Sequence, residues 1–254
     1  MKLSQARVLL VGASGGIGQA MTRQLRAAGA HVVCVGRRWP QGMDKDALAA
    51  DITQPSGRAL ICQAVKDQQI NVVVIASGLA LFGPCQEANE MALEQLIQTN
   101  VTAPIQLVTG LLAELHRCQH AQLIFVGSAL GRIGVPGFSA YGASKAAIHG
   151  FAEGLRRELS GTSVRVQLLA PRATQTSFND SKTEEFNRLT GTQSDSPDLV
   201  ANALLSLIES EAAERFMGFP ERLGVRLNGL LGAWMDGSFK SHVRALATVF
   251  SKKQ

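Results

Sequence analysis

The amino-acid sequence predicts an α/β fold: a single doubly wound parallel sheet with helices on both faces, plus a C-terminal helical extension. Two observations predict the sheet. Short apolar runs alternate along the chain with segments in which apolar residues recur at helical spacing. The runs are continuous rather than alternating in polarity, as in parallel strands buried on both faces. We see no linker and no internal repeat, so one domain is expected over residues 1–214, followed by the extension at 215–254.

The expected elements alternate in order along the chain. Strands are predicted at 7–11, 31–35, 47–50, 72–75, 123–126 and 164–169, and helices at 17–25, 59–65, 91–115, 141–159 and 199–208. Gly29 should end the first helix, and Pro104 should bend the long one or mark its irregular part. Asp51 follows Arg37 closely, so the second crossover is expected to be a loop or a single turn.

The composition excludes several classes of protein. No apolar run approaches the ~20 residues that a membrane span needs, and the N-terminus is a poor signal peptide. The four cysteines are scattered without a zinc-site pattern, which favours a reduced, cytoplasmic setting and no metal. The net charge is +5, but the 25 basic residues are dispersed, so no nucleic-acid partner is expected.

A glycine-rich segment follows the first expected strand and opens the first helix. Its spacing is G-x-x-x-G-x-G, and the residues expected to bind a phosphate are Gly12, Ser14, Gly15, Gly16, Ile17 and Gly18. Glycines let a ligand approach the backbone, and a helix N-terminus offers free N–H groups to a pyrophosphate. The alternative is a tight strand-to-helix turn that binds nothing.

The second expected strand ends in two arginines, Arg37 and Arg38. In dinucleotide-binding folds an acidic residue at this position binds the ribose hydroxyls, whereas arginine accepts a 2′-phosphate. The pair therefore favours NADP(H) as cofactor over NAD(H). The alternative is a pair of solvated loop residues.

The chain contains one tyrosine, Tyr141, four residues before Lys145 on the same helical face. Ser128 follows the strand that ends at Val126, and Asn100 lies in the preceding helical region. Each residue alone is more often a packing or surface residue. Their combination after a nucleotide-type loop is the informative feature.

These motifs together resemble the short-chain dehydrogenase/reductase family, in its standard-length NADP(H)-type form. The resemblance covers about residues 2–208 and consists of the glycine segment, Ala76-Ser77-Gly78, Asn100, Ser128 and the Tyr141/Lys145 pair. It implies a Rossmann fold and hydride transfer between NADP(H) and a carbonyl or alcohol substrate. It also implies a homo-oligomer, a dimer or a tetramer.

The resemblance implies a role for each site residue. Tyr141 would be the general acid/base, with Lys145 lowering the pKa of Tyr141 and binding the nicotinamide ribose. Ser128 would donate a hydrogen bond to the substrate oxygen, and Asn100 would hold a water molecule. Further cofactor contacts are expected from Asp51, Ile52, Gly78, Pro171, Thr174 and Thr176.

The chain departs from the family pattern at three places. Val11 replaces a threonine that ties the glycine loop together, Ala76 and Ser77 stand where asparagine is usual, and Arg172 replaces a glycine. None of these changes removes a catalytic group. Because Ala76 and Ser77 lack the asparagine side chain, the edge of the strand before Gly78 must be stabilised in another way.

Substrate specificity is expected from a polar loop, residues 172–197, that can close over the substrate. Residues that can line the pocket are Phe178, Phe186, Leu189, Phe138, Leu130 and Ile133, and Arg172 or Arg132 can meet an acidic group. The extension carries apolar stripes at 223–234 and 239–250 with several basic residues. We expect it to pack on the domain or on a second subunit, with peripheral membrane contact as the alternative.

Three functions stay open at this point. The first is an NADPH-dependent carbonyl reductase, or the reverse alcohol dehydrogenase. The second is a 3-oxoacyl thioester reductase that acts on acyl-carrier protein in lipid metabolism. The third is a non-catalytic NADP(H)-binding sensor, against which the complete set of Ser128, Tyr141 and Lys145 argues.

Overall fold

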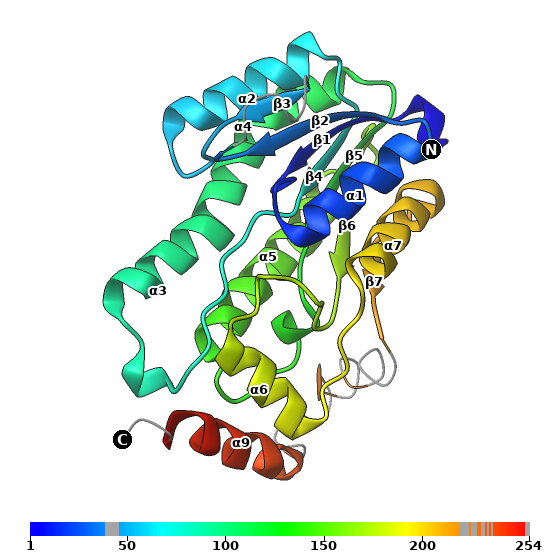
Figure 1. The fold of residues 1–254 in the computed structure, drawn as a ribbon. Helices are drawn as coiled ribbons and strands as arrows, with labels where there is room; N and C mark the ends of the chain where they lie inside the picture. Colours follow the sequence, from blue (N-terminus) through cyan, green and yellow to red (C-terminus); the bar gives the residue numbers. More distant parts are fainter. Residues whose placement is uncertain are drawn as a thin grey trace.

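The computed structural model describes residues 1–38, 46–218, 224, 228, 229, 232, 234 and 236–251. In this part of the chain, parallel strands form one sheet in the order β3-β2-β1-β4-β5-β6-β7 (Figure 1). The strands are β1 (Arg7–Val11), β2 (His31–Gly36), β3 (Ala47–Ala49), β4 (Val72–Ile75), β5 (Ala121–Val126), β6 (Val164–Ala170) and β7 (Glu214–Phe216). The predicted fold class is confirmed, and β7 is a short edge strand that the apolar pattern did not predict.

Helices cover both faces of the sheet because successive residues of each strand point to opposite faces. On one face, side chains such as Leu9 and Val11 pack against α2 (Pro55–Asp67), α4 (Ala103–Arg117) and α5 (Ser139–Glu158). On the other face, Val8 and Leu10 pack against α1 (Gly16–Ala27) and α7 (Pro197–Ser210). The continuous apolar strands of the sequence thus supply two separate cores.

The long helical region predicted at 91–115 is interrupted, as Pro104 indicated. It consists of α3 (Glu90–Ile97), a π-helical segment η3 (Gln98–Thr102) and α4. Proline has no N–H group to donate to the carbonyl of Asn100 four residues earlier, so regular α-helical bonding fails here.

The stretch Glu90–Arg117 is long and apolar enough to pass a composition test for a membrane span, with a mean hydropathy of 1.2. However, Leu107, Leu111 and Leu115 are completely buried against the sheet. Their burial accounts for part of the apolar composition, since 39% of the most apolar window is buried inside the protein.

The polar loop predicted after β6 contains a helix, which corrects that part of the sequence interpretation. α6 (Ser181–Thr190) begins where the Asp180 side chain accepts a hydrogen bond from the Thr183 N–H group. It ends at Gly191, which has a φ of 69°. The capping residues at both ends explain why a segment with few apolar residues is helical.

The chain ends in α9 (Lys240–Ser251), preceded by the short 3₁₀ segment η5 (Asp236–Phe239). α9 packs against α6 and buries Ala245 and Val249 (Figure 1). The helical stripe predicted at 223–234 lies largely outside the described residues. The short connection predicted after Arg37 lies partly outside them.

The sheet order reverses between β1 and β4. The chain runs from β1 outward to β2 and β3, then returns to place β4 on the other side of β1. In open α/β sheets a ligand binds in the crevice at the carboxyl ends of such a strand pair. The fold therefore positions the loops after β1 and β4 at a binding crevice.

Gly57→Ala should lower the free energy of unfolding by about 1–3 kcal/mol, because the new methyl group would collide with the carbonyl of Asp51. Gly154→Ala is the matched control: it also lies inside a helix, but nothing occupies the space beside it within 4 Å. That change should raise the free energy of unfolding by about 0.5–1 kcal/mol through helix propensity. Guanidinium denaturation measures both, and equal effects would contradict the packing argument.

Candidate active site

A cavity of about 740 Å³ lies at the carboxyl ends of the central strands. The predicted site residues that line it are Gly12, Ser14, Gly15, Gly16, Ile17, Gly18, Arg37, Asp51, Ile52, Gly78, Ser128, Tyr141, Lys145, Pro171, Thr174 and Thr176. Arg38 and Asn100 were also predicted, and they do not line it. One cavity thus joins the glycine loop to the Ser128, Tyr141 and Lys145 side chains.

The glycine loop packs closely against the loop that follows β4. Gly12 has a φ of 90°, and a Cβ atom there would lie 2.7 Å from the backbone nitrogen of Ser77. The backbone nitrogens of Gly12 and Ala13 both donate hydrogen bonds to the carbonyl of Val35, at 2.9 and 3.1 Å. These bonds hold the loop in place without the hydroxyl group that Val11 lacks.

The N-terminus of α1 is open to the cavity. The N-cap residue is Gly15, and no side chain caps the helix. The first-turn N–H groups of a helix favour an anion. Gly18 is buried, and a Cβ atom there would collide with the Gly12 carbonyl, so glycine lets α1 pack closely on the loop. A Cβ atom at Gly16 would lie 2.7 Å from the Thr176 methyl carbon, so the segment after β6 closes over this loop. The uncapped helix and the bare glycine backbone fit the pyrophosphate of a dinucleotide.

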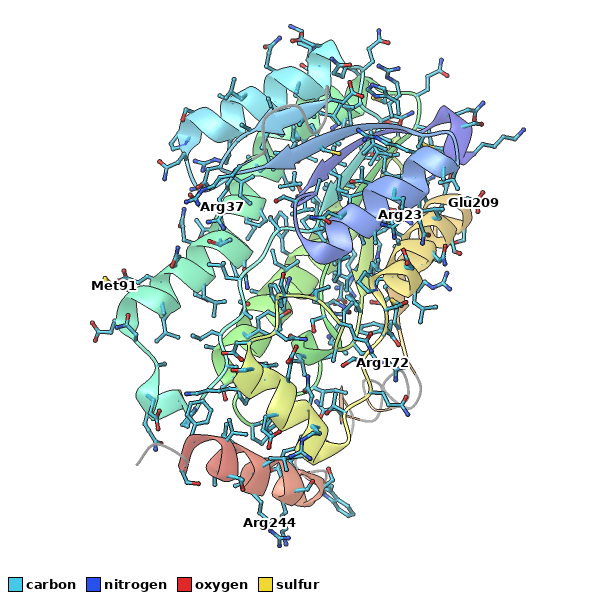
Figure 2. All side chains as sticks on the ribbon, in the orientation of Figure 1. Arg23, Arg37, Met91, Arg172, Glu209 and Arg244 are labelled. Atoms are coloured by element: carbon cyan, nitrogen blue, oxygen red, sulfur yellow. The ribbon has the colours of Figure 1, made fainter. Side chains whose placement is uncertain are left out.

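Arg37 and Asp51 lie together at the β2/β3 end of the cavity. Arg37 is exposed just beyond β2 and lines the cavity (Figure 2). The Asp51 carboxylate accepts hydrogen bonds from the Thr53 backbone nitrogen and hydroxyl, at 2.9 and 2.7 Å. Ile52 is buried beside it. Arg37 lines the cavity, whereas Arg38, the next residue, does not.

Asn100 stabilises the loop after β4, which lacks the family's usual asparagines. Its side-chain amide donates to the carbonyl of Leu79 at 3.0 Å and accepts from the Leu79 N–H group at 2.7 Å. The same amide also donates to the Ser144 hydroxyl at 3.0 Å. Asn100 is fully buried and therefore ties η3, the β4 loop and α5 together from behind the cavity wall.

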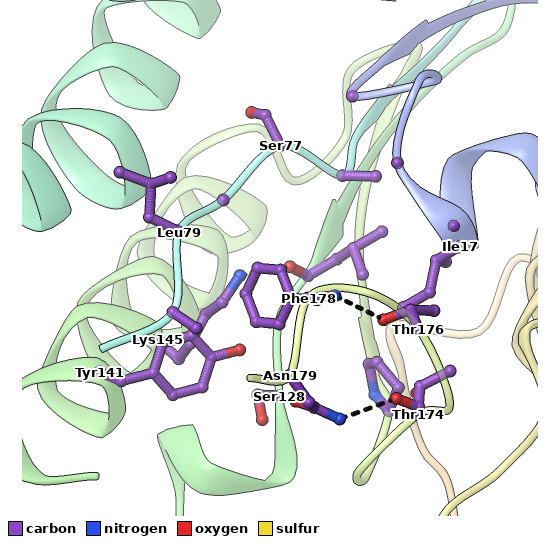
Figure 3. Close-up of a pocket in the computed structure, with 18 of the residues that line it drawn as sticks. Ile17, Ser77, Leu79, Ser128, Tyr141, Lys145, Thr174, Thr176, Phe178 and Asn179 are labelled. Atoms are coloured by element: carbon purple, nitrogen blue, oxygen red, sulfur yellow. Dashed lines mark hydrogen bonds between the residues drawn. The ribbon is translucent and has the colours of Figure 1, made fainter. Parts of the chain in front are cut away.

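Ser128, Tyr141 and Lys145 converge on the cavity (Figure 3). The Lys145 ammonium group donates to the carbonyl of Val126 at 3.1 Å and lies 5.8 Å from the centre of the Tyr141 ring. The loop after β4 passes beside this ammonium group, since a Cβ atom at Gly78 would lie 3.4 Å from it. The Ser128 hydroxyl accepts a hydrogen bond from the Leu130 N–H group at 3.1 Å and keeps its own proton to donate.

Burial determines the protonation of the two titratable groups. It raises the pKa of Tyr141 to about 12, and a hydrogen bond with Ser128 partly offsets this rise. Burial also lowers the pKa of Lys145 to about 8. The protein alone therefore does not lower the pKa of Tyr141, whereas a lowered pKa is expected for the protein with an oxidised nicotinamide bound. In this state Tyr141 is a neutral phenol that can donate a proton.

The segment after β6 carries a buried ion pair. The Arg172 guanidinium binds the Asp195 carboxylate, with nitrogen-oxygen distances of 2.7 and 3.0 Å. Arg172 is thus engaged within the protein, and Arg132 bonds to His149 and Glu153 and does not line the cavity. Arg132 is therefore not placed to meet an acidic substrate, whereas Arg172 lines the cavity and is paired there with Asp195.

Thr174 and Thr176 are fixed by their own segment. The Thr174 carbonyl accepts a hydrogen bond from the Asn179 side chain at 3.0 Å, and the Thr176 hydroxyl accepts one from the Phe178 N–H group at 3.3 Å (Figure 3). Asn179 lines the cavity and was not singled out in the sequence. Its side chain bonds to backbone close by, which only the folded loop reveals.

The cavity continues into an apolar chamber next to Tyr141. Its walls include all but one of the side chains predicted to line a pocket: Leu130, Ile133, Phe138, Phe178 and Phe186. Leu189 is instead 40% exposed and does not line it. His242 of α9 also lines the chamber. It could not be predicted from the sequence, because its position depends on how α9 packs on the rest of the protein.

Among the described residues no group of histidine, cysteine and carboxylate side chains can hold a metal ion. The four cysteines are free thiols.

Because Tyr141 is the one tyrosine in the sequence, its pKa can be measured directly by absorbance. Native protein at pH 10 should show roughly 1% phenolate absorbance near 295 nm, because a pKa of about 12 leaves the phenol protonated. The chain unfolded in guanidinium should be half ionised at that pH. Half ionisation of the native protein at pH 10 would show that burial does not control this group.

Comparison with known proteins identifies the family. The sequence model of the short chain dehydrogenase family matches residues 6–187. The 3-ketodihydrosphingosine reductase of Bacteroides thetaiotaomicron is 26% identical over 249 residues, which cover 97% of this chain and 90% of that protein. Oxidoreductase claN of Passalora fulva is 35% identical over 182 residues, 67% of this chain and 83% of its own. The 3-oxoacyl acyl-carrier-protein reductase FabG of Escherichia coli is 24% identical over 225 residues, 81% of this chain and 90% of its own.

Solved structures agree with the fold. A short chain dehydrogenase from Burkholderia cenocepacia in complex with NADP superposes with a TM-score of 0.82 at 22% identity, covering 94% of this chain and 99% of that one. The family match extends from the start of β1 into α6 and includes every strand except β7. The chain belongs to the short chain dehydrogenase family, whose members are oxidoreductases that use a nicotinamide cofactor.

Proposed function

We propose that this protein is an NADPH-dependent reductase of ketones or aldehydes, which also catalyses the reverse alcohol oxidation. One observation carries the proposal: the dinucleotide-type glycine loop, Arg37 and the Ser128–Tyr141–Lys145 group open into the same cavity. A protein that only sensed the cofactor would not need a buried proton donor aligned with a hydroxyl donor. The complete catalytic group therefore favours an enzyme over a sensor.

The chain's own residues supply binding, orientation and one proton. The nicotinamide supplies the hydride when it is bound. The Ser128 hydroxyl would donate a hydrogen bond to the substrate carbonyl oxygen and stabilise the negative charge that develops there. Tyr141, a neutral phenol through burial, would then donate its proton to that oxygen. The Lys145 ammonium would favour the tyrosinate that remains and would hold the nicotinamide ribose.

Arg37 supports NADPH as the preferred cofactor. It stands directly after β2, it is exposed to solvent and it lines the cavity. A planar guanidinium forms bidentate, charge-assisted hydrogen bonds with a phosphate group. The Asp51 carboxylate, whose orientation Thr53 fixes, would contact the adenine, with Ile52 packed on the base.

A second candidate is reduction of a 3-oxoacyl thioester. The names of two relatives, 3-oxoacyl acyl-carrier-protein reductase and 3-ketodihydrosphingosine reductase, both specify a ketone at the third carbon. A higher kcat/KM for a 3-oxoacyl thioester than for a simple ketone of equal chain length would favour this candidate.

Tyr141→Phe should lower kcat/KM for carbonyl reduction by about 100- to 10,000-fold, because it removes the proton donor and keeps the ring. NADPH oxidation, followed by absorbance over a panel of ketones, aldehydes and thioesters, measures the loss. The Kd for NADPH, measured by fluorescence titration, is the control and should change little. Full turnover by this variant would remove Tyr141 from the mechanism.

Arg37→Ala should weaken NADPH binding by about 10- to 100-fold and leave NADH binding unchanged, because a charged hydrogen bond to the 2′-phosphate is lost. Arg38→Ala is the matched control, since Arg38 is also exposed but does not line the cavity. Titration of both variants with both cofactors measures the effect. A larger loss in the Arg38 variant, or equal losses of NADH and NADPH, would contradict the assignment.

A further inference from the structure

The C-terminal helix α9 forms the outer wall of the chamber next to Tyr141. Its inner stripe consists of His242, Ala245, Leu246, Val249 and Phe250, at the spacing of one helical face. The stripe packs on α6 and on the residues around Phe82 and Phe138. The contact is close, since a Cβ atom at Gly137 would lie 2.9 Å from a methyl carbon of Leu246. The charged side chain of Arg244 points away from the domain (Figure 2).

His242 is the member of this stripe that lines the cavity. Its ring contacts Phe186, with centroids 5.9 Å apart, and Phe239, with centroids 5.2 Å apart. Its Nδ1 atom shares a hydrogen bond with the Ser241 hydroxyl at 3.3 Å, and Nε2 has no partner in the part of the chain that the structure describes. Burial lowers the pKa of this imidazole, so the ring is neutral at physiological pH. It is therefore a hydrogen-bonding group in the wall that Phe186 and the polar Thr183 and Asn187 side chains of α6 also line.

The remainder of the chamber is uncharged. The charged side chains that line the whole cavity are Arg37, Asp51, Lys145 and Arg172, among the described residues. The first two lie at the β2/β3 end, Lys145 belongs to the catalytic group, and Arg172 is paired with Asp195. A carboxylate in the chamber would lose its hydration without gaining a cation as partner.

His242 is separated from Tyr141 by phenylalanine rings. The ring of Tyr141 contacts Phe138 at 6.3 Å between centroids, Phe138 contacts Phe186 at 5.9 Å, and Phe186 contacts His242. A long apolar chain can lie along these rings and place a polar group at His242.

We propose that the substrate is an uncharged, elongated apolar carbonyl compound whose far end bears a hydroxyl or similar polar group, and that His242 recognises this group. The inference rests on the proposed reductase function for the position of the carbonyl. It makes α9 part of the substrate site and His242 a residue that determines specificity.

The test uses methyl ketones of increasing chain length, each with a methyl, hydroxymethyl or carboxylate group at the far end. Binding is measured by calorimetry to the protein saturated with NADP⁺, which has no hydride to transfer. The kcat/KM is measured separately with NADPH. The variants are His242→Phe, which keeps an aromatic ring, and His242→Gln, which keeps a hydrogen-bonding group. Val243→Ala is the control, since Val243 is the next residue on α9 and is 56% exposed.

At the best chain length the hydroxymethyl ketone should bind about tenfold more tightly than the methyl ketone, and the carboxylate should bind most weakly. His242→Phe should abolish the preference for the hydroxymethyl group and leave binding of the methyl ketone within about threefold. His242→Gln should retain part of the preference, and Val243→Ala should retain all of it.

Three results would overturn the inference: tightest binding of the carboxylate, no dependence on chain length, or an unchanged hydroxymethyl preference in His242→Phe. The expected binding order with no turnover of any ketone would support the chamber assignment and refute the proposed reductase function. Turnover of ketones with a different binding order would support the proposed reductase function and refute the chamber assignment. The two proposals therefore fail separately.

Discussion

The contact between Gly12 and Ser77 is the constraint on which the site depends. It brings the ends of β1 and β4 so close that no side chain fits at position 12. The two strands are neighbours because the chain crosses back past β1 after β3. The crevice between their loops, the open N-terminus of α1 and the cavity beyond it follow from that crossing. The positive φ of Gly12 is thus a requirement of topology as well as of ligand access.

Asn100 shows how an unusual sequence keeps the same arrangement. The loop after β4 contains Ala76 and Ser77, and it is supported by one amide, that of Asn100, which bonds both backbone groups of Leu79. The π-helical segment turns this amide inward, and Pro104 makes the segment irregular. The same amide reaches Ser144 on the helix that carries Tyr141 and Lys145. A backbone irregularity therefore links the cofactor side of the cavity to the catalytic helix.

The sequence predicted the sheet and most of the cavity lining because apolar periodicity and motif spacing are local signals. It missed α6, whose helical state depends on end caps rather than on an apolar stripe. It missed His242 because the cavity residue that its ring contacts, Phe186, lies far from it along the chain. Burial raises the pKa of Tyr141 in the protein alone, whereas the lowering expected from the sequence involved Lys145 together with the charge of an oxidised nicotinamide, and it stays a prediction. The domain boundary, the homo-oligomer, the cytoplasmic setting and the membrane alternative stay predictions.

The position of α9 has a consequence for how such a protein can diversify. The helix touches the rest of the described structure through one stripe, on α6 and two short loop segments, and it contributes no strand to the sheet. Exchange of this terminal helix would replace one wall of the chamber while the glycine loop, the switch between β1 and β4 and the catalytic tyrosine kept their places. A change confined to the 12 residues of α9 would therefore alter this wall without touching the sheet.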